Sequence, residues 1–279
     1  MSRKVVVLAG GLGSRLRPFT EVIPKPLLPI GEKSVLEIQV ERFKHYGFDE
    51  VILATNYKAE YIENFFGDGS RYGIKLKVSK ETKPLGTVGP LKLIEKELTE
   101  PFMVMNGDIL TLIDFQKFFD FAVEKKSLLT VAIKKVLMPY AFGNIFFKGD
   151  LVTEIQEKPE FVTYALAGIY VMSPEILKLI PADEYYGMDS LLKRMLAEGL
   201  PVSKYEIEEY WLDIGRVDDF QKAQDLYERH FKGATSSTTE RLDNKVALVR
   251  DEVLKPEPSS REVVEPQGNN QSRLYNMSK

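Results

Sequence analysis

The 279-residue sequence contains no cysteine and only two histidines. Without cysteine there are no disulfides, no thiolate metal sites and no cysteine nucleophile, and a reducing cytoplasmic location is the expectation. The histidines, His45 and His230, both fall in stretches with a helical pattern, and we interpret both as structural. Chemistry in this chain is therefore expected from carboxylates, cations and backbone groups.

Long hydrophobic runs and an excess of one charge are also lacking. The N-terminal run VVVLA is short and is followed at once by glycines, so it predicts a buried strand and not a signal peptide or membrane span. A net charge of −3 with interspersed acids and bases gives no field for nucleic acid. We expect neither nucleic acid nor a membrane as partner, and a homo-oligomer is compatible with the sequence.

Between residues 4 and 106, short β-branched runs alternate with amphipathic stretches. The pattern predicts strands at 5–9, 51–55, 74–78 and 102–106 and helices at 35–45, 59–66 and 88–97. Such βα alternation indicates a Rossmann-like three-layer α/β fold with a mostly parallel mixed sheet, whose ligands bind at the carboxyl ends of the strands. That edge should collect Gly10–Arg17, Thr55–Asn56 and Asn106–Asp108.

The pattern changes after residue 128. Strand-like runs to residue 171 predict a small antiparallel insert with a hairpin at Gly149-Asp150. Helices at 174–180, 187–197 and 217–231, a strand at 202–207 and the segment WLDIG follow. We expect a catalytic domain over 1–232. Residues 233–279, rich in Ser, Thr, Asn, Pro and charge, are predicted to form a disordered or mobile tail.

A glycine-rich segment, LAGGLGSRLRPFT, follows the first strand. It is not a dinucleotide fingerprint, because Leu16 stands where the third glycine is required, and no GK[ST] closes it as a P-loop. Arg15 and Arg17 follow, and Lys25 lies between two prolines that restrict where it points. The residues alone leave two interpretations open: a backbone cradle for a triphosphate, or an ordinary turn with surface cations.

Two acids stand at predicted strand ends. Asp108 follows FMVMNG, and Asp213 lies in YWLDIG, just before Gly215. Two such carboxylates with phosphate oxygens would suit Mg²⁺, although isolated strand-end aspartates are more often turn or cap residues.

These motifs resemble a known family. GGLGSRLRPFT and PKPLLPIGEKSVLE are similar to the signature of the sugar-1-phosphate nucleotidyltransferases, and NGD, EKP and WLDIG follow in the order of that family. The resemblance reaches about Phe231 and is strongest to mannose-1-phosphate guanylyltransferase-like members. It implies that the loop binds the triphosphate, that Arg15 holds the departing pyrophosphate, that Lys25 contacts phosphates, and that Asp108 and Asp213 hold Mg²⁺.

The same resemblance implies a nucleotide site. Its expected residues are Leu8, Ala9, Gly10, Gly11, Gly13, Arg15, Lys25, Pro84, Gly86, Thr87, Asn106 and Gly107. PLGTVGPL is similar to the PLGTAGPL of mannose-1-phosphate guanylyltransferases and favours guanine, hence GTP. A plain helix start is the alternative interpretation of this string, and members that use other bases have similar loops.

On the acceptor side, the resemblance assigns Gly143, Glu157, Lys158 and Gly168 to the sugar phosphate. Charged neighbours such as Glu157-Lys158 are otherwise simply a solvated strand end. Leu166 stands where many relatives have Asn, and Phe142 where a Tyr is common. Because both changes remove a polar group, the sugar stays open between a hexose and a heptose 1-phosphate.

The expected reaction is Mg²⁺-dependent transfer of a nucleotidyl group from a nucleoside triphosphate, GTP first, to a sugar 1-phosphate, with release of pyrophosphate. An ionised sugar phosphate needs no general base. Two alternatives remain. One is transfer to a non-sugar phosphate such as phosphocholine. The other is a non-catalytic regulatory subunit that binds nucleotide sugars, although a binder has little need for the two metal acids.

Overall fold

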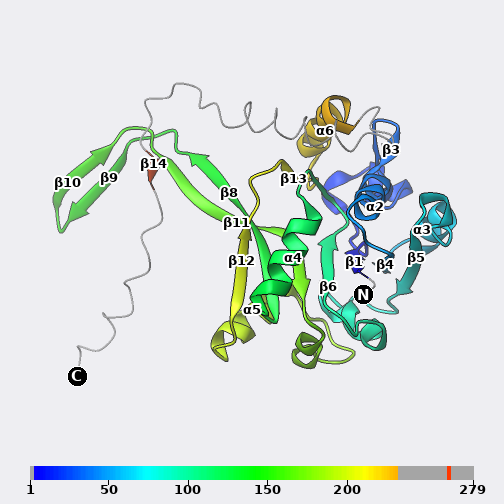
Figure 1. Ribbon diagram of the computed structural model, residues 1–279. Helices are drawn as coiled ribbons and strands as arrows, with labels where there is room; N and C mark the ends of the chain where they lie inside the picture. Colours follow the sequence, from blue (N-terminus) through cyan, green and yellow to red (C-terminus); the bar gives the residue numbers. More distant parts are fainter. Residues whose placement is uncertain (1–2, 232–262, 265–279) are drawn as a thin grey trace.

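The computed structural model describes residues 3–231 and 263–264 (Figure 1). Six α-helices lie in this part of the chain: α1 (Phe19–Val22), α2 (Val35–His45), α3 (Ala59–Phe66), α4 (Phe115–Lys125), α5 (Met188–Ala197) and α6 (Val217–Leu226). Short 3₁₀ helices occupy Ser14–Leu16, Lys25–Leu27, Ser70–Tyr72, Gly89–Glu97 and Pro174–Leu179. The turn Tyr227–Phe231 is a π-helix that extends α6.

One sheet runs through the molecule. Its strands lie in the order β12 (Val202–Glu206), β8 (Leu129–Pro139), β11 (Glu160–Met172), β6 (Phe102–Asn106), β1 (Lys4–Leu8), β4 (Glu50–Thr55) and β5 (Lys75–Lys80). Strands β6, β1, β4 and β5 are mutually parallel, whereas β11 is antiparallel to both β6 and β8. The predicted mostly parallel mixed sheet is confirmed.

Three small sheets complete the fold. They pair β7 (Ile109–Thr111) with β13 (Trp211–Asp213), β9 (Asn144–Lys148) with β10 (Leu151–Gln156), and β2 (Pro29–Ile30) with β3 (Lys33–Ser34). The hairpin expected at Gly149-Asp150 is confirmed as the turn between β9 and β10. The remaining strand, β14 (Val263–Val264), pairs with β11.

The predicted antiparallel insert is confirmed in the β9–β10 hairpin, while the inner halves of β8 and β11 are buried and apolar and join the main sheet. One expectation needs correction. The segment 89–97 is a 3₁₀ helix with non-helical backbone at Ile94 and a proline in its first turn. The predicted tail 233–279 lies outside the described residues, apart from Val263–Val264. None of the described helices is sufficiently long and apolar to span a bilayer.

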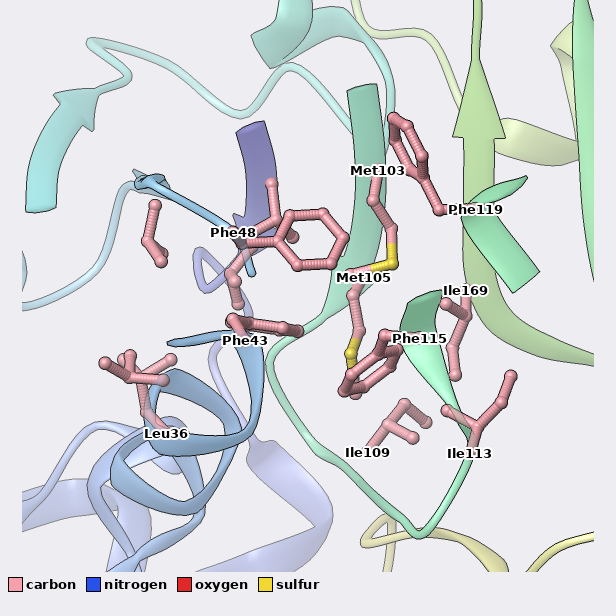
Figure 2. Close-up of a cluster of buried hydrophobic side chains, with 14 of the residues drawn as sticks. Leu36, Phe43, Phe48, Met103, Met105, Ile109, Ile113, Phe115, Phe119 and Ile169 are labelled. Carbon is pink, nitrogen blue, oxygen red and sulfur yellow. The ribbon is translucent and has the colours of Figure 1, made fainter. Parts of the chain in front are cut away.

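The core consists of layers on the two faces of the sheet. Alternate residues of β6 point to opposite sides, so Met103 and Met105 join one cluster while Phe102 and Val104 join the other. Figure 2 shows the two methionines among the aromatic rings of the first cluster, where the centroids of Phe43 and Phe115 are 5.1 Å apart. Helices α2 and α4 supply those rings and thereby cover one face.

The order in which the chain adds strands to the sheet reverses between β1 and β6. From β1 the chain passes through α2 to β4 and β5 on one side, and then returns to place β6 on the other side. Leu8 and Asn106 are register partners at the ends of these parallel strands. Ligands of open α/β sheets bind at such a switch point, outside the carboxyl ends, because the chain segments leaving the two strands diverge there.

Candidate active site

The glycine-rich loop leaves β1 at this switch point. Gly13 has φ +61°, and a Cβ there would lie 2.7 Å from Cγ2 of Thr20, so only glycine fits the turn. Thr20 Oγ1 donates a hydrogen bond of 2.8 Å to the Gly13 carbonyl. The same Cβ position is 3.3 Å from Cβ of Lys25. The turn therefore brings Lys25 against the loop.

Asp108 lies beside that lysine. Gly107 N donates to Leu8 O at 3.0 Å, which holds the NGD turn at the end of β1. Lys25 Nζ and Asp108 Oδ2 form an ion pair in which the side chains are only 11% and 23% exposed. Asp108 Oδ1 is buried and has no hydrogen-bond partner in the described part of the chain. Such an orphaned carboxylate oxygen is a candidate ligand atom.

Asp213 arrives from the other end of the chain on β13. Its strand pairs with β7, and Ile214 N donates to Asp108 O at 3.0 Å, so the two aspartates are neighbours across the strands. Burial raises the pKa of Asp213, the negative charge of Asp108 raises it further, and Lys25 and Arg15 act against both. Two neighbouring carboxylates repel each other, and a cation bound between them would remove this repulsion and stabilise both ionised groups.

Arg15 closes the group. Two of its guanidinium nitrogens and Asp213 Oδ1 all lie 3.5–3.6 Å from the point where a Cβ of Gly215 would stand, so Arg15 and Asp213 both lie against Gly215. The described residues contain no cluster of three metal-ligating side chains. The two acids fit Mg²⁺ in one respect: this hard cation is commonly held by one or two carboxylates together with substrate phosphates.

Residues that the sequence analysis did not single out position these acids. Gln39 of α2 is 2% exposed, and its Nε2 donates to Asn106 O at 3.2 Å and to Ile109 O at 2.8 Å, on either side of Asp108. Trp211 Nε1 donates to Ala167 O at 2.8 Å and ties β13 to β11. For Gln39, the sequence offered one sign of this role: a polar residue on the apolar face of a predicted helix.

The candidate base loop packs against the segment that precedes α5. Gly86 has φ +81° and abuts Tyr186 O, and Thr87 Oγ1 accepts a hydrogen bond of 2.7 Å from Met188 N. Pro84 is exposed at the start of the loop. The structure thus gives Thr87 a structural hydrogen bond in addition to any contact with a base.

Glu81 begins the same loop and was not among the predicted site residues. Its Oε2 accepts a 2.9 Å hydrogen bond from Leu85 N. A Cβ added to Gly10 would lie 3.1 Å from Glu81 Oε1 and 3.3 Å from Asn56 N. Burial raises the pKa of Glu81, opposed by the hydrogen bond from Leu85. A half-buried acid therefore stands between the two loops that are expected to hold the nucleotide.

The four residues expected to bind the sugar phosphate lie in two separate places. Gly168 has φ +69°, and a Cβ there would lie 2.6 Å from Nδ2 of Asn106, so Gly168 lies beside the NGD turn. The other three lie on a projecting arm, which we define as residues 134–166: the outer halves of β8 and β11 and the β9–β10 hairpin (Figure 1). Gly143 and Glu157 are neighbours there, and both are exposed, as is Lys158.

Lys158 is well separated from Gly168 along the strand. Residues 159–167 lie between them, and those that belong to β11 span roughly 25–30 Å at ~3.3 Å per residue. This distance exceeds the length of any side chain. In the described chain, Gly143, Glu157 and Lys158 therefore do not meet Asp108, Asp213 and Lys25.

Comparison with known proteins agrees with the geometry of the centre. A family model described as nucleotidyl transferase matches residues 4–230. The mannose-1-phosphate guanyltransferase of Saccharomyces cerevisiae is 34% identical over 233 residues, which cover 80% of this chain and 64% of that protein. The chain thus spans less than two thirds of the length of this curated relative.

Two solved structures are also similar. A putative glucose-1-phosphate thymidylyltransferase from Bacillus anthracis, in complex with a sucrose, has 26% identity and a TM-score of 0.67, covering 81% of this chain and 95% of its own. HddC from Yersinia pseudotuberculosis, complexed with GMP-PN, has 28% identity and a TM-score of 0.63, covering 80% and 99%. The shared fold, the match over residues 4–230 and the assembled motifs together show that this chain belongs to the nucleotidyl transferase family.

Proposed function

We propose that this protein transfers a guanylyl group from GTP to a sugar 1-phosphate with the help of Mg²⁺, releasing pyrophosphate, in the cytoplasm. The observation that carries the proposal is the meeting of Arg15, Lys25, Asp108 and Asp213 at the sheet switch point, beneath a glycine-rich loop. Two acids and two cations from four separate segments are more than a turn or a cap requires.

The donor side is the better defined half of the site. Backbone N–H groups of Gly10–Gly13 would surround the phosphates, and Arg15 would stabilise the negative charge that develops on the departing pyrophosphate. Lys25 is paired with Asp108 in the described structure and would exchange this partner for a phosphate oxygen. Asp108 and Asp213 would hold Mg²⁺, which when bound neutralises charge on the phosphate oxygens.

The transfer step is a substitution at phosphorus. An ionised oxygen of the sugar 1-phosphate forms the new bond to the α-phosphorus of GTP, and the bond from that phosphorus to the α,β-bridging oxygen breaks. Pyrophosphate leaves with the electron pair, and a nucleoside diphosphate sugar remains. The attacking oxygen carries no proton at neutral pH, so the site needs no base. This suits a chain whose site residues include no histidine.

Glu81 supports guanine as the base. Guanine presents two neighbouring donors, N1–H and the 2-amino group, and a carboxylate accepts both. Glu81 Oε2 already accepts from Leu85 N, and Oε1 faces the glycine loop. Burial strengthens such a contact because water competes less for the carboxylate. Relatives named for other nucleotides, including the thymidylyltransferase above, make the base the part of this proposal most in need of a direct test.

A substrate matrix tests the function. GTP, UTP, CTP, dTTP and ATP are each combined with a panel of sugar 1-phosphates and with phosphocholine, and pyrophosphate release is measured with and without Mg²⁺. We expect release only when triphosphate, acceptor and Mg²⁺ are all present, and fastest with GTP. Turnover with phosphocholine but with none of the sugar 1-phosphates would show that the acceptor is a non-sugar phosphate. No turnover with any pair would favour a non-catalytic binder.

A further inference from the structure

Three consecutive backbone carbonyls converge on one lysine at the base of the arm. Lys134 lies on β8, and its Nζ donates to the carbonyl oxygens of Ile207, Glu208 and Glu209 at 3.1, 3.0 and 2.8 Å. A lysine ammonium has three N–H donors, and these three carbonyls can use all of them. The lysine is therefore committed to this segment of the chain, which leaves it no donor for a substrate.

The bound segment connects the central sheet to the strand that carries Asp213. Strand β12 ends at Glu206, and Ile207 N donates to Ile133 O at 2.8 Å. Strand β13 begins two residues after Glu209 and ends at Asp213, beside β7. Lys134 thus binds the chain at the point where it leaves the large sheet for the small one.

Lys134 points to the face of the sheet on which this segment packs. Alternate residues of a strand point to opposite sides, so Lys134 shares the face of Ala132, while Lys135 shares that of Ile133. Ala132 belongs to the core cluster that also contains residues of α2 and α4, and Trp211 of β13 packs against the same cluster. Ile133 belongs to the cluster on the other face. The two adjacent lysines therefore form a matched pair on opposite faces.

The charge of Lys134 is partly withdrawn from water. Burial lowers the pKa of Lys134, and the negative charges of Glu209, Glu206 and Glu208 oppose this shift. A buried ammonium is unfavourable unless hydrogen bonds replace its hydration, and bonds from a charged donor are the strong ones. Lys135, by contrast, is exposed and keeps its hydration. The hydrogen bonds of Lys134 to segment 207–209 offset the desolvation of its charge.

We propose that Lys134 is a positioning residue for Asp213: its ammonium fixes segment 207–209 and thereby the register of β13 beside Asp108. The inference rests on the proposed function, in which Asp213 holds Mg²⁺. Without the ammonium, three adjacent carbonyls lose their common donor, and the segment is expected to move toward water to regain hydrogen bonds. A displacement of about 1 Å at a catalytic group can lower the rate by up to ~100-fold.

The test compares three variants of the full chain. Lys134→Met keeps an unbranched apolar stem of similar length and removes every donor. Lys134→Arg keeps the charge and has donors enough for three carbonyls. Lys135→Met makes the first change on the opposite face and serves as the control. Circular dichroism checks that all are folded; if Lys134→Met does not fold, Lys134→Gln, which keeps an amide donor without the charge, takes its place.

The position of β13 can be measured without turnover. Trp211 is the only tryptophan of the sequence, so the intrinsic tryptophan fluorescence reports on this strand. In Lys134→Met, emission should shift to longer wavelength and acrylamide should quench it more strongly. Exchange of the Ile214 amide, which donates to Asp108 O, should become faster, because β13 opens more often. Lys134→Arg and Lys135→Met should resemble the wild type in both measurements.

Kinetics then connect the strand to the site. For Lys134→Met we expect kcat to fall by about tenfold and the Mg²⁺ concentration for half-maximal rate to rise by a similar factor, with KM for GTP nearly unchanged. Lys134→Arg should restore most of the loss. Such rescue, together with the altered Mg²⁺ requirement, distinguishes positioning of Asp213 from a general loss of stability.

The outcomes separate this proposal from the proposed function. Unchanged Trp211 emission and Ile214 exchange in Lys134→Met would show that Lys134 does not hold β13. A lower unfolding temperature with unchanged kcat and Mg²⁺ requirement would make Lys134 a structural anchor only, and would overturn its role in the site. Absence of turnover in the wild type would contradict the proposed function, while fluorescence and exchange would still decide whether Lys134 fixes the strand.

Discussion

The donor side and the acceptor side of the site are held in different ways. Asp108 follows β6 of the central sheet, where backbone hydrogen bonds to Leu8 and Ile214 and the buried Gln39 hold the turn that carries it. Asp213, on the neighbouring strand β13, and Lys25, which pairs with Asp108, lie against this turn. By contrast, three of the four acceptor-side residues lie on an exposed arm. Rigid elements position catalytic groups more accurately than projecting segments.

The difference suggests separate roles for the residues held by the sheet and for those on the arm. The proposed chemistry at phosphorus needs groups placed within a fraction of an ångström, and the sheet and α2 would supply this placement. The residues expected to bind the acceptor lie mostly on the exposed arm, and there Leu166 and Phe142 depart from the pattern of the resembled family. Four variants test whether the two sides are independent, from the largest expected effect to the smallest.

Asp108→Asn should have the largest effect, because it removes a charge from the reaction centre while keeping the shape of the side chain. We expect kcat to fall by about 10³-fold, corresponding to about 4 kcal/mol of lost charge stabilisation. Asp120→Asn is the control, since this surface aspartate pairs with Arg3 and is 53% exposed. Full activity of Asp108→Asn, with circular dichroism unchanged, would contradict its assignment as a metal ligand.

Gln39→Leu tests whether α2 positions the donor side. The substitution leaves the carbonyls of Asn106 and Ile109 without their donor, which costs about 1–3 kcal/mol of stability. Displacement of Asp108 should lower kcat by roughly 10- to 100-fold. The Mg²⁺ concentration for half-maximal rate should rise, while acceptor KM stays near the wild-type value. Loss of stability with an unchanged Mg²⁺ requirement would mean that Gln39 is structural only.

Glu81→Gln tests the base contact within the donor side. The amide can still accept from Leu85 N, but it cannot accept both guanine donors. We expect KM for GTP to rise by about tenfold, in line with ~1–3 kcal/mol for a good bidentate contact. The preference for GTP over ITP, which lacks the 2-amino group, should shrink. An unchanged GTP to ITP ratio would remove Glu81 from the base site.

Leu166→Asn probes the acceptor side and should have the smallest effect. Leu166 is 47% exposed and lies two residues from Gly168, near the base of the arm. Asn at this position would offer hydrogen bonds to sugar hydroxyls, so the ranking of sugar 1-phosphates should change by a few-fold, without an effect on KM for GTP. A change in GTP affinity of equal size would show that the two sides are coupled.

Local sequence patterns determined much of this molecule. Helices at Val35–His45 and Ala59–Phe66 and the strand Phe102–Asn106 were predicted with the observed bounds, because amphipathic spacing and apolar runs are local signals. For α2, the pair Ser34 and Glu37 forms a capping box that reinforces its start. The predicted helix at 88–97 is instead a 3₁₀ helix that is interrupted at Ile94, and the amphipathic spacing of this segment gave no sign of the interruption.

Contacts between distant segments required the tertiary structure. Nothing local to Gln39 or Trp211 reveals that each donates to a carbonyl from another part of the chain, because such pairings depend on how helix and strands pack. The place of Glu157-Lys158, at the outer end of β11, follows from the register of β8 against β11. Motif order in the sequence thus indicated the chemistry of the centre, whereas strand pairing over long separations decided which residues reach it and left the acceptor residues on the arm.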